Sequence, residues 1–185
     1  SHADHQSLPR TGELVSRSLG IEEIETRAAQ FESCFRALYE VIGDRCRTVN
    51  DDAVTVTLHI FARECGEWAA TFGDLGPHRA GAPLQVAPAH VGIADVVRRG
   101  FERDATGALV LYAITVEIIP PLLIVLRDAT QLEGTASGGR LSTRSSDAAS
   151  FLVATLHRVT DLLRSRSVPS DLENYAAEIR DFFHI

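Results

Sequence analysis

Two common residue types are missing from this sequence. It contains no lysine and no methionine, so all 18 of its basic residues are arginine. Arginine without lysine, together with abundant alanine, valine and aspartate, is typical of a GC-rich genome. The missing methionine indicates that the native start is absent. We therefore expect "SHADHQSLPR" to be a tag remnant within a flexible N-terminus that covers residues 1–14.

Positive charge is also scarce and dispersed. The formal net charge is −7 over 185 residues, of which 45% are hydrophobic and 23% charged; this is the size and composition of one globular domain. The densest basic spots are Arg98 with Arg99 and Arg164 with Arg166. A nucleic-acid-binding surface usually carries a clustered basic patch, so we expect no nucleic acid to bind through this domain.

Cysteines and catalytic signatures are sparse as well. Cys34, Cys46 and Cys65 are the three cysteines, and they show no CxxC or CxxH spacing, which argues against a structural zinc site. Isolated cysteines without a signal peptide indicate a reducing, cytoplasmic location. The sequence lacks a P-loop and the GxGxxG, HExxH and GxSxG motifs. It therefore favours a non-enzymatic protein, with a thiol-dependent enzyme that uses Cys65 as an alternative.

Two segments, 21–42 and 147–166, have the spacing of helices that pack against other helices. In both, apolar residues recur in alternating steps of three and four. Gly43 is expected to end the first helix, and Ser145 or Ser146 to cap the second. These seams offer more apolar surface than one sheet face needs, so we expect a homodimer joined by the two terminal helices. The seam residues are Ile21, Ile24, Ala28, Phe31, Phe35, Leu38 and Ile42, then Ala148, Leu152, Thr155, Val159 and Leu162.

Two other regions have the pattern of β-hairpins. In 53–61, β-branched and apolar residues alternate with Thr and His, which predicts a strand paired with a returning strand near 67–73. Residues 108–119 and 122–129 are apolar on both faces and are separated by Pro120-Pro121. Two adjacent prolines would interrupt a helix, so this region is predicted to be a central hairpin, and no membrane span is expected.

The segment 74–90 is rich in proline and glycine and leads into a short predicted helix, "VGIADVVRRG". His78 and His90 lie in this loop, where either could contact a ligand or ligate a haem iron. His90 precedes the helix, whose N-terminal amides favour an anion. We therefore expect a ligand with a carboxylate, phosphate or other acceptor group near His90, Val91 and Gly92; the sequence does not identify a cofactor.

The order of elements predicts an α+β fold with an antiparallel sheet, and residues 15–166 resemble the GAF family of small-molecule sensor domains. The resemblance lies in "VGIADVVRRG", in "ITVEIIPPLLIVL" and in "LSTRSSDAASFLVATLHRVTDLL". It implies a six-stranded sheet with long terminal helices on one face, a ligand pocket on the other, and frequent homodimers through those helices. Residues 167–185 are expected to be a helical extension.

The predicted pocket has three more candidate residues. Trp68 and Tyr112 are aromatic residues with one polar atom, which often line ligand sites. Glu117 is the only charge in the stretch 108–126, and a carboxylate in a central strand must pair, face solvent or face a polar cavity. On these grounds the chain is predicted to be a small-molecule sensing or regulatory domain.

An all-helical alternative is also consistent with part of the sequence. The segments "FESCFRALYEVIGDR" and "VVRRGFERD" suit a helical transcription regulator such as a TetR-like protein. The β-branched run at 53–61, the acidic net charge and the lack of a clear helix-turn-helix pattern weigh against it.

Overall fold

The structure, a computed structural model, describes residues 2–75, 88–132 and 139–183. Within those ranges every regular element is helical, and none is a strand. The predicted α+β fold is therefore wrong. The GAF resemblance is wrong with it, because that fold is built on a sheet. An all-helical chain is compatible with the alternative of a helical regulator.

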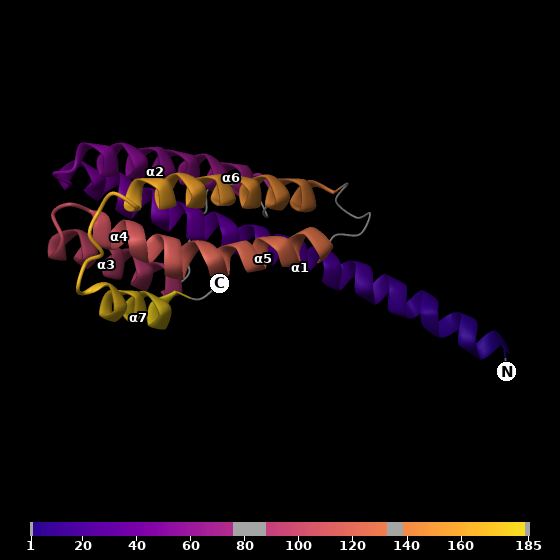
Figure 1. Cartoon of the computed structure of the whole chain (residues 1–185). Helices are drawn as coiled ribbons and strands as arrows, with labels where there is room; N and C mark the ends of the chain where they lie inside the picture. The colour runs from indigo at the N-terminus through magenta and orange to yellow at the C-terminus, as the bar shows by residue number, and fades with distance from the viewer. Residues whose placement is uncertain (1, 76–87, 133–138, 184–185) are drawn as a thin grey trace, which may run out of the picture.

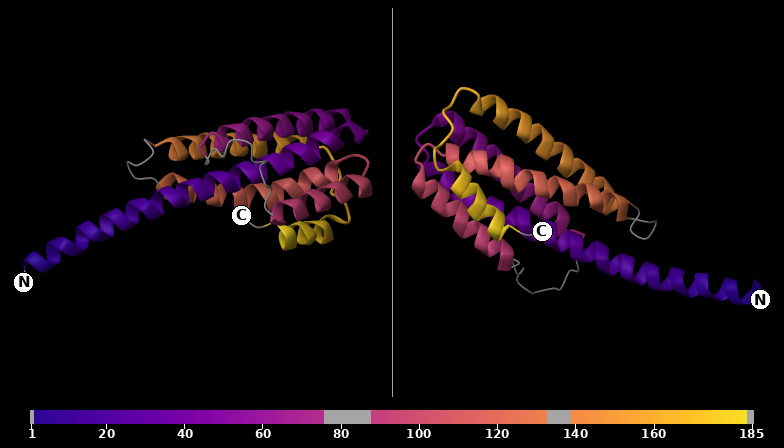
Figure 2. Two further views of the ribbon diagram at one scale, coloured as in Figure 1. Left: turned by 180° about the vertical axis from the view of Figure 1, so that it is seen from behind. Right: turned by 60° about the horizontal axis from the view of Figure 1, so that its bottom comes forward.

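The helices form an elongated bundle (Figure 1). Its elements are α1 (His2–Arg45), η1 (Cys46–Thr48), α2 (Asp52–Gly73), α3 (Pro88–Arg103), α4 (Ala108–Ala113), η2 (Ile114–Ile118), α5 (Ile119–Leu132), α6 (Arg140–Leu163) and α7 (Leu172–Phe182). Helices α2 and α6 lie side by side along one side of the bundle, and α7 lies on the opposite side, as the views in Figure 2 confirm. The first half of α1 extends beyond the other helices.

The region predicted as the first hairpin is the continuous helix α2. Its buried residues include Val54, Leu58, Phe61 and Cys65, which recur at helical spacing. Over residues 54–60 the alternation expected of a strand coincides with part of the helical spacing. The nine residues 53–61 are therefore too few to distinguish a strand from a helix. The β-branched threonines are accommodated because the hydroxyl of Thr57 donates to the carbonyl of Ala53, at 2.9 Å.

The second predicted hairpin is also one uninterrupted helix, Ala108–Gln131, which runs through Pro120-Pro121. Just before the prolines, η2 forms a wider π-helical turn in which the amide of Ile119 donates to the carbonyl of Ile114. The hydroxyl of Thr115 donates to Leu111 at 2.8 Å. A π-bulge relaxes the hydrogen-bond ladder that the prolines would otherwise break. By length and hydropathy alone this helix could cross a membrane, but 56% of its most apolar window is buried inside the bundle, as in the core helix of a bundle.

The helical predictions are largely confirmed. Phe31, Phe35, Leu38 and Ile42 of the first seam are buried, but the helix continues past Gly43 to Arg45. The second seam lies on α6, which begins at Arg140 rather than near Ser145 or Ser146. The predicted short helix and the C-terminal helical segment correspond to α3 and α7.

Helix α7 is anchored to the bundle by a buried tyrosine. Tyr175 is fully buried, and its hydroxyl donates to the carbonyls of Val96 at 2.9 Å and Val97 at 3.3 Å. Gly100 permits this approach, since a Cβ there would lie 2.1 Å from the tyrosine oxygen. Arg103 lies over the Tyr175 ring, 5.3 Å from its centroid, and pairs with Asp171 and Glu178. The C-terminal segment is therefore part of the packed bundle.

Candidate functional site

The residues predicted around the proline-rich loop are only partly visible. His78 and the side chains of His90 and Val91 lie outside the described part of the structure. Helix α3 begins at Pro88, so His90 is its third residue instead of preceding it. Gly92 is in contact with α7, because a Cβ at this position would lie 3.2 Å from the Phe182 ring. The predicted acceptor-binding site near His90 is not tested by this arrangement.

The other three predicted pocket residues lie apart from one another. Glu117 is 12% exposed and accepts two hydrogen bonds from Arg180 of α7, at 2.6 and 3.2 Å. Tyr112 donates to the carbonyl of Leu163, at 3.3 Å, near the end of α6. Trp68 lies on α2 beside Phe72, with ring centroids 6.2 Å apart. The predicted pocket that would combine these side chains belonged to the sheet, which is absent from the described residues.

The three cysteines are buried and free. Burial raises the pKa of the Cys34 thiol to about 12 and that of Cys65 well above 9.0. A thiol is nucleophilic as the thiolate, so Cys65 is poorly placed to act as one. The geometry gives no support to the thiol-enzyme alternative.

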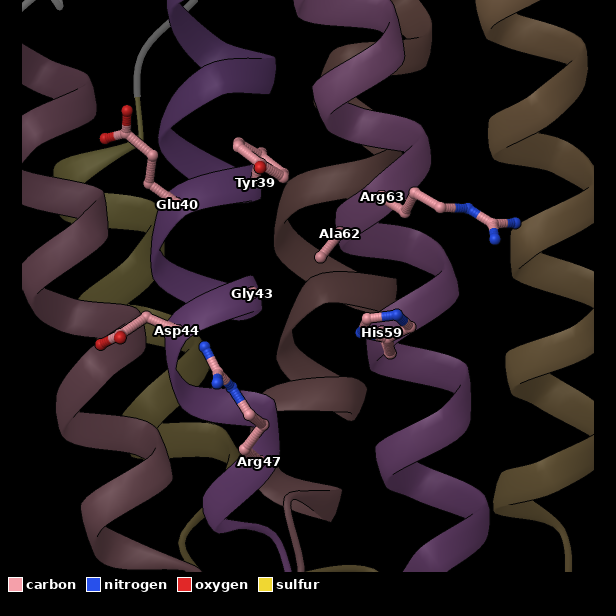
Figure 3. A pocket seen from close by; sticks show the side chains of 8 residues that line it. All are labelled: Tyr39, Glu40, Gly43, Asp44, Arg47, His59, Ala62 and Arg63. Carbon is pink, nitrogen blue, oxygen red and sulfur yellow. The ribbon is translucent and has the colours of Figure 1, made fainter.

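A groove between α1 and α2 has a volume of about 630 Å³ (Figure 3). This volume is in the range of small-molecule sites. We call it the α1–α2 groove. Its lining residues are Tyr39, Glu40, Gly43, Asp44, Arg47, His59, Ala62 and Arg63.

Small residues form the floor of the α1–α2 groove. A Cβ on Gly43 would lie 3.9 Å from the Cβ of Ala62, so the two helices approach closely here. One turn along, the ring of Tyr39 packs over Gly66, where a Cβ would lie 2.8 Å from the ring. Tyr39 is nevertheless 48% exposed. The groove therefore presents a planar aromatic surface beside a shallow floor without bulky side chains.

The charged side chains that line the groove point in different directions (Figure 3). The guanidinium of Arg47 points toward Gly43, and His59 faces the same level of the groove from α2. Glu40 and Asp44 line the groove but project away from α2, and Arg63 projects toward α6. No ion pair of Arg47 or His59 occurs among the described residues. The lining therefore combines two acids with two arginines, and Arg47 is the arginine that points toward the floor of the groove.

A second, smaller groove of about 270 Å³ lies on the other side of α2, against α6. We call it the α2–α6 groove; it is lined by Glu64, Glu67, Trp68, Thr71 and Phe151. The rings of Trp68 and Phe151 are stacked, with centroids 6.5 Å apart. This groove combines an aromatic wall with two carboxylates, and it contains Trp68, one of the residues predicted from the sequence.

Sequence reasoning missed Tyr39, Arg47 and His59. The spacing along the first helix could have pointed to Tyr39 and Arg47, and His59 could have been found if 52–73 had been predicted as a helix. Tyr39 and Gly43 are four residues apart on one face of α1, and Arg47 follows four residues later in η1. His59 and Ala62 share a face of α2 in the same way.

Comparison with known proteins adds no family to these observations. No protein-family model, curated protein or solved structure matches the chain. The candidate function therefore depends on the geometry and chemistry of the two grooves.

Proposed function

We propose that this chain is the regulatory part of a helical regulator, of the TetR-like kind, and that its α1–α2 groove binds a planar organic anion such as an aromatic carboxylate. The observation that carries the proposal is the arrangement of Tyr39, Arg47 and His59 around a floor of small residues. The role is one of binding, without chemistry on the ligand.

Each of the three side chains matches one part of such a ligand. The half-exposed ring of Tyr39 offers a face on which an aromatic ring can stack. Arg47 offers a planar set of donors that fits a carboxylate in a bidentate way. His59 adds a further donor from the opposite helix. Since Tyr39 is on α1, Arg47 is in η1 directly after it and His59 is on α2, a bound anion would bridge the two sides of the groove.

The position of the groove suggests how binding would be transmitted. Tyr39 and Gly43 lie near the end of α1, Arg47 follows in η1, and α1 extends at its other end beyond the bundle (Figure 1). A ligand that favours one spacing of α1 and α2 would bias the direction of that extension. Binding can shift an equilibrium only by its differential affinity for the two arrangements, so the ligand must contact both helices.

A homodimer is also part of the proposal, but with a different interface from the predicted seams. Phe31 and Phe35 are buried inside the chain against Phe72, at centroid distances of 5.0 and 5.9 Å, and are not available to a partner. Val116 and Ile124, two turns apart on the helix through the prolines, are 52% and 60% exposed. We assign the contact between two copies to this face.

Isothermal titration calorimetry tests the ligand site with 2-naphthoate and its uncharged analogue 2-naphthamide. The naphthoate is expected to bind with one site per chain, and the amide much more weakly, because the amide has no carboxylate charge for Arg47. Hydrogen bonds to charged groups contribute about 1.5 to 3 kcal/mol, so Arg47→Gln should weaken naphthoate binding roughly tenfold or more.

Arg164→Gln provides the matched control. Arg164 is 76% exposed, follows the end of α6 and is not one of the residues that line the groove, so its loss should leave naphthoate affinity unchanged. Equal affinities of the native protein for naphthoate and naphthamide would contradict the proposal. So would equal losses in the Arg47 and Arg164 variants, since they would show only a general effect of charge.

A further inference from the structure

We infer that the α2–α6 groove is a second binding site, specific for a small organic ammonium ion. This inference is independent of the anion site, which is formed by a different set of α2 residues together with α1. It rests on the juxtaposition of two carboxylates with a stacked pair of aromatic rings in one hollow.

The aromatic side of the groove is suited to a cation. Trp68 and Phe151 are stacked with an interplanar angle of 24° and are both half-buried, so together they form a wall that still faces the groove. The faces of aromatic rings attract cations, and tryptophan does so most strongly. Phe61 and Phe72 support the wall from within, with centroids 6.1 Å from Phe151 and 6.2 Å from Trp68. The wall is therefore held in place before any ligand binds.

The carboxylates supply the charge. Glu64, Glu67 and Trp68 lie within four residues of one another on α2 and line the same hollow. The Oε2 atom of Glu64 is buried and has no hydrogen-bond partner among the described residues. The hydroxyl of Thr71 already donates to the carbonyl of Glu67, at 2.9 Å. A buried, unpaired carboxylate oxygen is costly, and an ammonium group placed between it and the rings would satisfy it.

The size of the groove restricts the ligand further. A hollow of about 270 Å³ is smaller than the usual range for drug-sized ligands. It fits the head group of a compact amine or a quaternary ammonium ion. None of the residues that line the groove is cationic, so no side chain of the lining neutralises the two carboxylates.

The test uses the intrinsic fluorescence of the protein, because Trp68 is the only tryptophan in the chain. Choline is titrated, with its uncharged carbon isostere 3,3-dimethylbutan-1-ol and with sodium chloride as parallel titrants. Choline should change the Trp68 emission in a saturable way, while the isostere and the salt should not. Glu64→Gln should weaken the choline response at least tenfold, and Phe151→Leu should weaken it less.

Glu173→Gln is the control, since Glu173 is an exposed acid on α7; it should leave the choline response unchanged. The inference would be overturned if choline and its isostere gave equal responses, if Glu64→Gln bound choline as tightly as the native protein, or if choline changed the emission no more than sodium chloride did. The choline titration uses a different signal and different variants from the naphthoate titration. A negative result for one site therefore does not affect the test of the other.

Discussion

Arg166 and Asp51, 115 residues apart in sequence, are joined by two hydrogen bonds: Nε to Oδ2 at 2.7 Å and Nη2 to Oδ1 at 2.9 Å. The same carboxylate accepts from the amide of Val54, at 3.3 Å, and so caps the start of α2. Arg166 also donates to the carbonyl of Leu162 near the end of α6, at 3.0 Å. This contact fixes the antiparallel register of α2 and α6, and with it both walls of the α2–α6 groove.

The Asp51 contact predicts how stability depends on acid. The hydrogen bonds from Arg166 are the main reason that the pKa of Asp51 is lowered below its usual value of 3.8. A carboxylate with a lowered folded-state pKa contributes stability above the unfolded value, and this contribution is lost as the pH falls through the folded one. Asp51→Asn should therefore reduce the free energy of unfolding near neutral pH and flatten its decline in acid. Urea denaturation across that pH range measures both effects, and an unchanged acid slope would contradict the assignment.

Gly100 is expected to be indispensable for seating α7. A Cβ on Gly100 would overlap the hydroxyl of Tyr175, which is fully buried and cannot move aside. Gly100→Ala should lower the free energy of unfolding by about 1 to 3 kcal/mol, the usual cost of overpacking a core. Gly20→Ala is the control, because a Cβ there meets nothing within 4 Å; it should be neutral or slightly stabilising. Equal stability of the two variants in urea denaturation would argue against the close packing of α3 and α7.

The cysteines are expected to be unreactive in the folded protein. Burial raises the pKa values of Cys34 and Cys65 above 9.0, so few thiolates form at neutral pH. A chromogenic disulfide reagent should react with them slowly in buffer and rapidly in denaturant. Because the folded state holds these protons more tightly, stability should fall as the pH rises past 9.0. Rapid labelling of Cys65 in the folded protein would contradict this prediction and support the alternative of a thiol-dependent enzyme.

Self-association is predicted to depend on the exposed face of the helix through the prolines. Ile124→Asp places a charge on that face and should convert a dimer to a folded monomer in sedimentation velocity experiments. Val168→Asp is the control, because Val168 is similarly exposed, at 64%, but lies between α6 and α7. If the native chain sediments as a monomer at high concentration, the dimer is excluded.

The helices that could be predicted from the sequence are those in which apolar residues recur at helical spacing over many residues. Phe31, Phe35 and Leu38 identified the core face of α1, because a seam of that length has no plausible strand interpretation. The 53–61 run failed because its alternation coincides with the helical positions Val54 and Leu58. The 108–129 run failed because it is apolar on all sides, a pattern that periodicity cannot assign.

The candidate sites were harder to foresee than the helices. Pro120-Pro121 appeared to exclude a helix. The π-helical turn that accommodates the two prolines has no recognisable pattern in the local sequence. Trp68 was identified as a candidate, but its partner Phe151 is brought beside it only by the pairing of α2 with α6. The α1–α2 groove likewise depends on the close approach of Gly43 and Ala62, which is a property of the packed helices.

The central claim, that the α1–α2 groove binds an organic anion, is tested most directly by mapping 2-naphthoate onto the ¹⁵N-labelled protein by NMR. The backbone amides of residues 39–47 and 59–66 should show the largest saturable shifts, and the Arg47→Gln variant should lose them. Shifts that cluster on another face of the bundle, or that are the same in the Arg47→Gln variant, would contradict the claim.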